Sequence, residues 1–241
     1  MSVKKPYFAE GQIYHIYNRG VEKREIFMQT GDYFRMVHDM FELNDLDAIV
    51  NTVRHLNPHK SMEARPHYIH TERKPRKILV KILAFALMPN HYHLLLEQVR
   101  PGGIIKFMQK LGTAYTMYFN KIYERVGPLL QGRFKAVHVN QDAHFVHLPF
   151  YIHANPIDLM YRGPTSNTST TSMSPMEFLK NYRWSSFPDY VGIKNFPSVT
   201  SREFLLEFFG GEKEYEQATE QWLAERNEHE SEITDLIIDP E

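Results

Sequence analysis

The stretch from Met88 to Glu97, Met-Pro-Asn-His-Tyr-His-Leu-Leu-Leu-Glu, constrains the fold more than any other part of this sequence. Apolar residues at 84–87 before it and at 94–96 within it indicate a strand buried in the centre of a sheet. A Pro-Asn pair interrupts the apolar run, which favours a turn or a bulge just before His91. We therefore expect the core to form around this strand.

His91 and His93 stand two residues apart in the same strand. Both imidazoles should leave one face of the sheet, while Tyr92 points to the other. Two neutral imidazoles on one rigid face can occupy two corners of a metal site, because histidine is the commonest protein ligand for divalent ions. Two ordinary polar-face histidines are the alternative interpretation.

A second segment, Tyr151 to Pro156, carries a phenol and an amide four residues apart in an expected helix that begins near Asp142. This spacing puts Tyr151 and Asn155 on one helix face, where both can reach the same ion or phosphate. Pro156 should end the helix. Pro149 removes a backbone donor and can kink the chain. Either the helix starts near Pro149, with Asp142 to Leu148 as a separate turn, or Tyr151 approaches its target along a different path.

The net charge of −1 hides a strong asymmetry along the chain. Residues 1–140 carry 21 Lys and Arg against 12 Asp and Glu, whereas residues 141–241 carry 7 against 17. The positive half can attract phosphates, and the acidic half should face away from them. Much of the basic excess lies in an expected inserted loop at about 50–77, which is either a plain solvated loop or an arm that grips nucleic acid. Its candidate contacts are Arg73, Lys74, Arg76 and Lys77.

Two further expected strands carry polar side chains beside the central strand. Residues 14–19 alternate, and so do residues 130–139, where Arg133 and Lys135 share one face. Arg and Lys at this spacing suit phosphate capture, with generic surface charge as the alternative. The order strand, helix, strand, strand, helix, strand, helix predicts an α+β fold, an antiparallel sheet with helices packed on one face.

Four motifs together resemble the HUH-type single-tyrosine transposases of insertion sequences, and in particular their REP-associated relatives. The motifs are Tyr14–Gly20, Met88–Glu97, Gly132–Lys135 and Tyr151–Pro156, with a weaker similarity at Trp184–Phe187. The resemblance implies a ferredoxin-like catalytic core that cleaves and rejoins hairpin-bearing single-stranded DNA. It implies that Tyr151 is the nucleophile, forming a 5′-phosphotyrosine, and that His91, His93 and Asn155 hold Mg²⁺ or Mn²⁺. In this family the first strand flanks the active site, which makes His15, Asn18 and Arg19 expected DNA contacts.

The chemistry of the residues agrees with this role. A tyrosine with a pKa near 10 is a poor nucleophile at neutral pH without help from a cation or a base. Tyr115 and Tyr118 are competing nucleophiles, but their three-and-four spacing with apolar neighbours predicts the core face of a helix. A silent binding module for structured single-stranded nucleic acid, or a metal-dependent hydrolase that uses water, remains an alternative function.

For the domain organisation we expect a catalytic domain at 1–160, a Ser/Thr-rich linker at 161–175 and an acidic helical extension at 176–241. A helical cap on the core is one interpretation of this extension, and support of a homodimer is the alternative. The sequence has no cysteine, which excludes disulfides and thiolate metal sites. It has no apolar run of membrane-spanning length and no apolar stretch after its first basic residues. We therefore expect a cytoplasmic, nucleoid-associated protein with no membrane partner.

Overall fold

The computed structural model describes residues 7–47, 75–161 and 173–226. Most of the expected basic loop at 50–77 and of the expected linker at 161–175 therefore lies outside the described residues. In chain order the elements are β1 (Ile13–Arg19), η1 (Val21–Lys23), α1 (Thr30–Glu42), β2 (Val80–Met88), β3 (His91–Gln98), α2 (Gly103–Ile122), β4 (Lys135–His138), α3 (Asp142–Ala154), η2 (Asn155–Ile157), α4 (Asp158–Tyr161), α5 (Pro175–Asn181), α6 (Phe187–Tyr190), α7 (Glu203–Phe209) and α8 (Glu212–Ala224).

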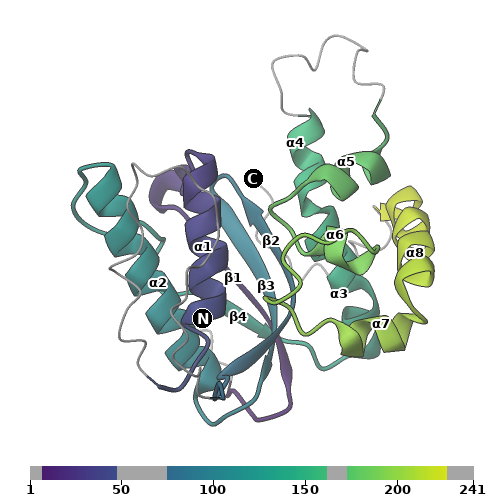
Figure 1. Ribbon diagram of the computed structural model, residues 1–241, viewed down its shortest axis with the longest axis horizontal. Coiled ribbons are helices and arrows are strands. Elements are labelled where there is room, and N and C mark those ends of the chain that lie inside the picture. Colours follow the sequence, from purple (N-terminus) through teal and green to yellow (C-terminus); the bar gives the residue numbers. More distant parts are fainter. Residues whose placement is uncertain (1–6, 48–74, 162–172, 227–241) are drawn as a thin grey trace, which may run out of the picture.

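The four strands form one antiparallel sheet in the order β2-β3-β1-β4 (Figure 1). Helix α1 connects β1 to β2, and α2 connects β3 to β4, so consecutive strands are not neighbours except at the β2–β3 hairpin. In this βαββαβ order, each helix connects two strands that have another strand between them, which is the ferredoxin-like arrangement. The predicted fold class is confirmed, and β3 with its two histidines is a central strand.

The Pro-Asn pair forms the turn of the β2–β3 hairpin. The loop before α1 anchors this turn, because Ile26 and Phe27 both donate their backbone N–H groups to the carbonyl of Pro89, at 2.7 and 3.0 Å. Gly20 donates in turn to the carbonyl of Asn90 at 2.8 Å. Both turn residues thus accept backbone hydrogen bonds. These bonds hold in place the turn that directly precedes His91, the first residue of β3.

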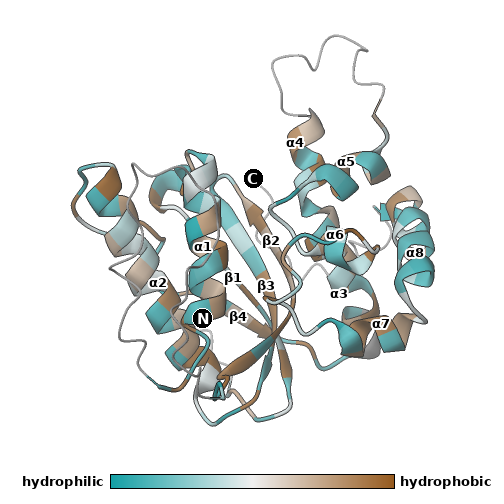
Figure 2. Cartoon of the chain, in the orientation of Figure 1, coloured by the Kyte–Doolittle hydropathy of each residue, from teal (hydrophilic) through white to brown (hydrophobic). Residues whose placement is uncertain are grey.

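The two faces of the sheet are covered by different helices. Apolar residues of α1 and α2 pack on one face, and their buried side chains include Met36, Phe107 and Tyr115. Apolar residues of α3 and of the C-terminal helices pack on the other face (Figure 1). Among the strands between these layers, β2 is mostly apolar, and β3 is apolar at its centre (Figure 2). The sequence predicted helices on one face, and the structure adds this second helical layer.

Small side chains let the second layer approach the sheet closely. Ala84 and Ala86 of β2 are fully buried and belong to the same cluster as Leu148 and Ile152 of α3. The segment before α6 pairs with the outer edge of β2, because Ser185 forms an antiparallel bridge with Ala86 and Ser186 donates its backbone N–H to the carbonyl of Phe85 at 3.0 Å. Helix α3 is consequently enclosed between the sheet and the C-terminal helices.

Helix α3 runs without a break from Asp142 to Ala154 and contains Pro149. The structure thus favours a continuous helix over a start near Pro149. Proline cannot donate to the carbonyl four residues earlier, so Phe145 lacks that helical bond. Burial on both sides stabilises the helix in spite of this loss. The α-helix ends at Ala154 as expected, but Asn155 keeps helical dihedral angles and the chain continues as η2.

The last strand is shorter than expected. Only Lys135–His138 pair with β1, and residues 131–134, which include Arg133, form a bent connection. The predicted order of strands and helices is confirmed from β1 to α3.

Candidate active site

The sheet register collects polar side chains on the face that α3 covers. His93 pairs with Tyr17, and His91 pairs with Arg19, on the neighbouring strand β1. Directly opposed residues of antiparallel strands point to the same face, so these four side chains share it. His15 lies two residues before Tyr17 and shares this face too.

His91 and Asn155 meet at the edge of this face. Nε2 of His91 lies 3.1 Å from Oδ1 of Asn155, although the residues are 64 positions apart in the sequence. Nδ1 of His91 lies 2.6 Å from Oδ1 of Asn90 and donates its proton to this oxygen. A proton on Nδ1 leaves the lone pair of the neutral ring on Nε2, which points toward Asn155.

This pair fits two ligands of one divalent ion. In an octahedral site with ligands at about 2.1 Å, adjacent ligand atoms lie about 3 Å apart, and the observed separation is 3.1 Å. An imidazole nitrogen and an amide oxygen are both ligand types that Mn²⁺ accepts. Asn90 contacts the other ring nitrogen of His91, and its oxygen fixes the tautomer and the orientation of the ring.

His93 is fully buried beside this pair. Burial lowers the pKa of His93 well below 6.5, and the neighbouring rings of His91 and His15 lower it further. His93 is therefore a neutral imidazole at physiological pH, which is the form that binds a metal. Its Nδ1 lies 2.9 Å from Nε2 of His15. Its Nε2 is buried with no hydrogen-bond partner among the described residues.

Tyr151 of α3 packs edge-on against the two inner histidines. Its ring centroid lies 5.6 Å from that of His93 and 6.3 Å from that of His15, with interplanar angles of 88° and 82°. The backbone N–H of Asn155 donates to the carbonyl of Tyr151, so the last turn of α3 sets both residues on one face, as predicted. Tyr151 keeps 5% of its surface exposed.

The structure thus brings Tyr151, His91, His93 and Asn155 together from β3 and the end of α3. Among the described residues, no group of three or more His, Cys, Asp and Glu side chains is placed to hold a metal. The amide oxygen of Asn155, 3.1 Å from Nε2 of His91, is the third protein ligand that this geometry offers beside the two histidines. The unpaired Nε2 of His93 and the His91–Asn155 spacing fit such an ion.

The competing tyrosines lie on the other face of the sheet. Tyr115 is fully buried in α2, and its hydroxyl donates to the carbonyl of Ile26. Tyr118 donates to Oδ1 of Asp32 at 3.0 Å. Both hydroxyls have structural partners there, which agrees with the predicted core-facing stripe.

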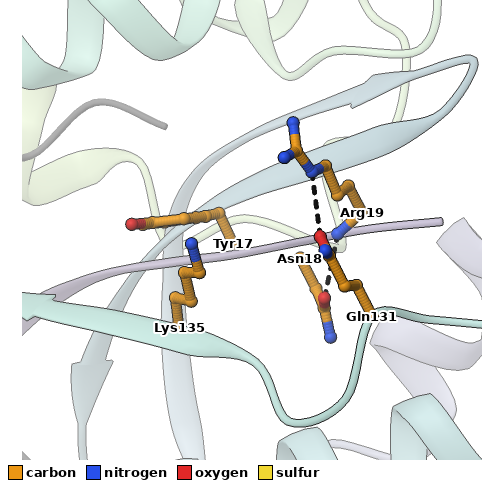
Figure 3. Close-up of a pocket in the computed structure, with 5 residues that line it drawn as sticks. All are labelled: Tyr17, Asn18, Arg19, Gln131 and Lys135. Atoms are coloured by element: carbon orange, nitrogen blue, oxygen red, sulfur yellow. Dashed lines mark hydrogen bonds between the residues drawn. The ribbon is translucent and has the colours of Figure 1, made fainter. Parts of the chain in front are cut away.

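A small open pocket lies beside the histidines where β1 meets β4. It is lined by Tyr17, Asn18, Arg19, Gln131 and Lys135 (Figure 3). Nε of Arg19 donates to Oε1 of Gln131 at 3.0 Å, and the ammonium of Lys135 lies 5.8 Å from the centre of the Tyr17 ring. This pocket therefore presents two cations next to the strand that carries His93.

The other expected DNA contacts are placed differently. Arg133 is exposed in the bend before β4. Asn18 is nearly buried; its amide donates to the carbonyl of Gly132 at 3.3 Å, and its oxygen accepts the backbone N–H of Arg19 at 2.9 Å. His15 has no exposed surface at all, so it cannot touch DNA in this conformation.

Of the residues expected in the basic arm, the two that the structure describes, Arg76 and Lys77, do not reach this site. Arg73 and Lys74 lie outside the described residues. Arg76 stacks over the Phe41 ring at 4.0 Å and donates to the carbonyls of Phe41 and Asn44 at the end of α1. Lys77 forms a 3.2 Å ion pair with Asp47. Both precede β2, whose first residue pairs with Gln98, at the end of the sheet opposite to His91.

Sequence reasoning missed three members of this neighbourhood. Asn90 was treated only as a strand breaker, although its position directly before the first histidine was a usable signal. The sequence carries no comparable signal for Tyr17 and Gln131, because only the strand register places these two side chains in the pocket.

The segment that carries this geometry is similar to a known protein family. A family model described as "Transposase IS200 like" matches residues 49–155. The predicted resemblance is confirmed. The matched segment contains all four residues of the candidate site, and it ends at Asn155. It covers rather less than half of the chain and leaves out β1 and the C-terminal helices.

A solved structure described as a REP-associated tyrosine transposase bound to a REP hairpin is similar to this chain at 14% identity and a TM-score of 0.45, covering 81% of this chain and 90% of that one. No curated protein matches the chain. Among the described residues, no helix is long and apolar enough to cross a membrane.

Proposed function

We propose that this protein is a metal-dependent transposase and endonuclease that cleaves and rejoins hairpin-bearing single-stranded DNA through a covalent 5′-phosphotyrosine intermediate. One observation carries the proposal. The side chains of Tyr151, His91, His93 and Asn155, which lie in the segment that matches IS200-like transposases, converge on one face of the sheet.

Tyr151 is the nucleophile of the proposed reaction. Its phenolate oxygen attacks the phosphorus of a phosphodiester and forms the new P–O bond. The bond from phosphorus to the 3′ oxygen breaks, and this oxygen leaves as a free 3′-hydroxyl after taking up a proton. The 5′ side of the break stays on the tyrosine, and attack by another 3′-hydroxyl reverses the step on a new strand, so no external energy source is required.

His91, His93 and Asn155 would hold Mg²⁺ or Mn²⁺, which when bound polarises the scissile phosphate and neutralises charge that develops on its oxygens. The protein's own part is orientation. Asn90 fixes the ring of His91 at 2.6 Å, and the last turn of α3 fixes Tyr151 relative to Asn155. A nucleophile and its supporting groups held on a strand and a helix need little rearrangement before the reaction.

The basic pocket beside β1 supplies binding. Arg19 and Lys135 would contact phosphates of the strand that runs past the histidines, and Arg133 is exposed nearby. The hairpin in the substrate follows from the motif resemblance, and a homodimer is one of the working forms that the resemblance allows. A DNA substrate of this kind would put the protein in the cytoplasm at the nucleoid.

The test is covalent capture. The full chain is incubated with Mn²⁺ and hairpin-bearing single-stranded oligonucleotides from the flanks of its own gene, and adducts are resolved on a denaturing gel. We expect an adduct that needs the ion and is absent from Tyr151→Phe. Tyr118→Phe is the matched control, because it removes a tyrosine hydroxyl on the other face of the sheet, and it should form the adduct like the unaltered protein.

The alternatives predict other gels. Cleavage without an adduct, persisting in Tyr151→Phe, would identify a hydrolase that uses water. Binding of these oligonucleotides with no cleavage would identify a binding module. Either result contradicts the proposed tyrosine chemistry.

A further inference from the structure

We propose that His15 is a positioning residue of this site: its imidazole holds Nδ1 of His93 and thereby directs Nε2 of His93 at the metal position. The proposal rests on the proposed function, because it gives His15 a role behind the ligands His91, His93 and Asn155. It also accounts for a fully buried histidine that lies outside the matched family segment.

The two rings form a hydrogen-bonded pair inside the protein. Nε2 of His15 lies 2.9 Å from Nδ1 of His93, and the rings are nearly parallel at 14°. Both residues have no exposed surface. No bulk water competes for this hydrogen bond, so it controls the rotation of the His93 ring.

The direction of the hydrogen bond decides what His93 can do. When His93 donates from Nδ1, its Nε2 carries a lone pair. When His15 donates instead, Nε2 of His93 carries a proton that is buried without an acceptor among the described residues. A buried donor without a partner is costly, whereas a lone pair at the same place is satisfied by a cation. The arrangement therefore favours donation from His93 to His15.

His15 stands behind His93 and is not a ligand itself. Its Nε2 is engaged by His93, and the described residues contain no three His, Asp or Glu side chains placed to hold one ion. The ring of His15 also lies edge-to-face with the ring of Tyr151, and the two ring centroids are 6.3 Å apart. His15 thus contacts both the inner ligand and the nucleophile, and orienting partners of this kind set the affinity of metal sites.

The experiment measures Mn²⁺ affinity of the full chain without DNA, from the electron paramagnetic resonance signal of free Mn²⁺. His15→Phe keeps a ring in the core but removes the acceptor, and we expect it to weaken Mn²⁺ binding by about 10- to 100-fold. His15→Gln places an amide oxygen near the position of Nε2, and it should restore most of the affinity.

Tyr190→Phe is the control for a general loss of stability. It deletes one buried hydrogen bond, to the carbonyl of Leu83, on the same face of the sheet. It should lower the melting temperature without changing Mn²⁺ affinity.

His91→Ala separates the two proposals. If His91→Ala abolishes Mn²⁺ binding while His15→Phe binds like the unaltered protein, the positioning role is wrong and the metal site stands. Equal losses in His15→Phe and His15→Gln also overturn the role, because they indicate packing alone. If His91→Ala binds Mn²⁺ normally, the metal site of the proposed function fails, and the role of His15 fails with it.

Discussion

Replacing Asn44 by alanine should destabilise the fold, because one buried amide joins the end of α1 to the start of β2. Nδ2 of Asn44 donates to the carbonyl of Val80 at 2.8 Å. Its Oδ1 accepts the backbone N–H groups of Leu79 and Val80 at 3.0 and 3.1 Å. Asn44 is 6% exposed, so water does not replace these bonds readily. It therefore fixes both ends of the long segment between the two elements.

Alanine at position 44 leaves three buried backbone groups without their partner. Each net hydrogen bond contributes about 1 kcal/mol, so the free energy of unfolding should fall by about 3 kcal/mol. Urea unfolding followed by tryptophan fluorescence measures this loss. Asn181→Ala is the matched control, since the exposed Asn181 makes one bond within its own helix, to the carbonyl of Glu177. A loss at position 44 no larger than that of the control, with an unchanged urea dependence, would refute the reasoning.

Two further predictions concern pH and salt. Burial lowers the pKa of His153 to about 3 in the folded protein, whereas the pKa of histidine in the unfolded chain is about 6.5. Between these two pH values the unfolded chain binds a proton at His153 that the folded protein does not bind. Stability is then lost as pH falls, by about 1.4 kcal/mol per unit and about 2.7 kcal/mol at pH 4.5. His153→Gln should lack this part of the loss in urea titrations at pH 7 and 4.5, and parallel losses would contradict it. Lys135→Ala should weaken single-stranded DNA binding and reduce the slope of log affinity against log salt by about 0.7, whereas Lys180→Ala, whose partner is Glu216, should leave the slope unchanged.

Much of the candidate site could be predicted from sequence because it depends on local periodicity. The two-residue spacing of His91 and His93 on a buried strand fixes their common face. The four-residue spacing of Tyr151 and Asn155 fixes theirs, and the backbone bond between them preserves it at the helix end. Both relations hold whatever the rest of the chain does, so one sequence was enough to find them.

The remaining features depend on tertiary contacts that carry no local signal. The pattern of residues 14–19 gives the face of His15 but not its neighbours, and the register with β3 turns an expected DNA contact into a buried partner of His93. Arg76 looked like part of a mobile basic arm, yet it stacks on Phe41 and binds carbonyls at the end of α1. Charge alone did not distinguish a DNA contact from a helix cap.

The position of the proposed nucleophile depends on the C-terminal helices, although they lie outside the matched family segment. Phe150, next to Tyr151, packs between Phe209 and Tyr215 with ring centroids 4.9 and 5.1 Å away. On the same side, Nδ1 of His153 lies within hydrogen-bond distance, 2.8 Å, of the hydroxyl of Tyr215. One side of α3 presents Tyr151 to the histidines while the other is held by α7 and α8. Because α3 contains a proline and lacks one of its own hydrogen bonds, this external packing is what keeps Tyr151 and Asn155 in register with β3.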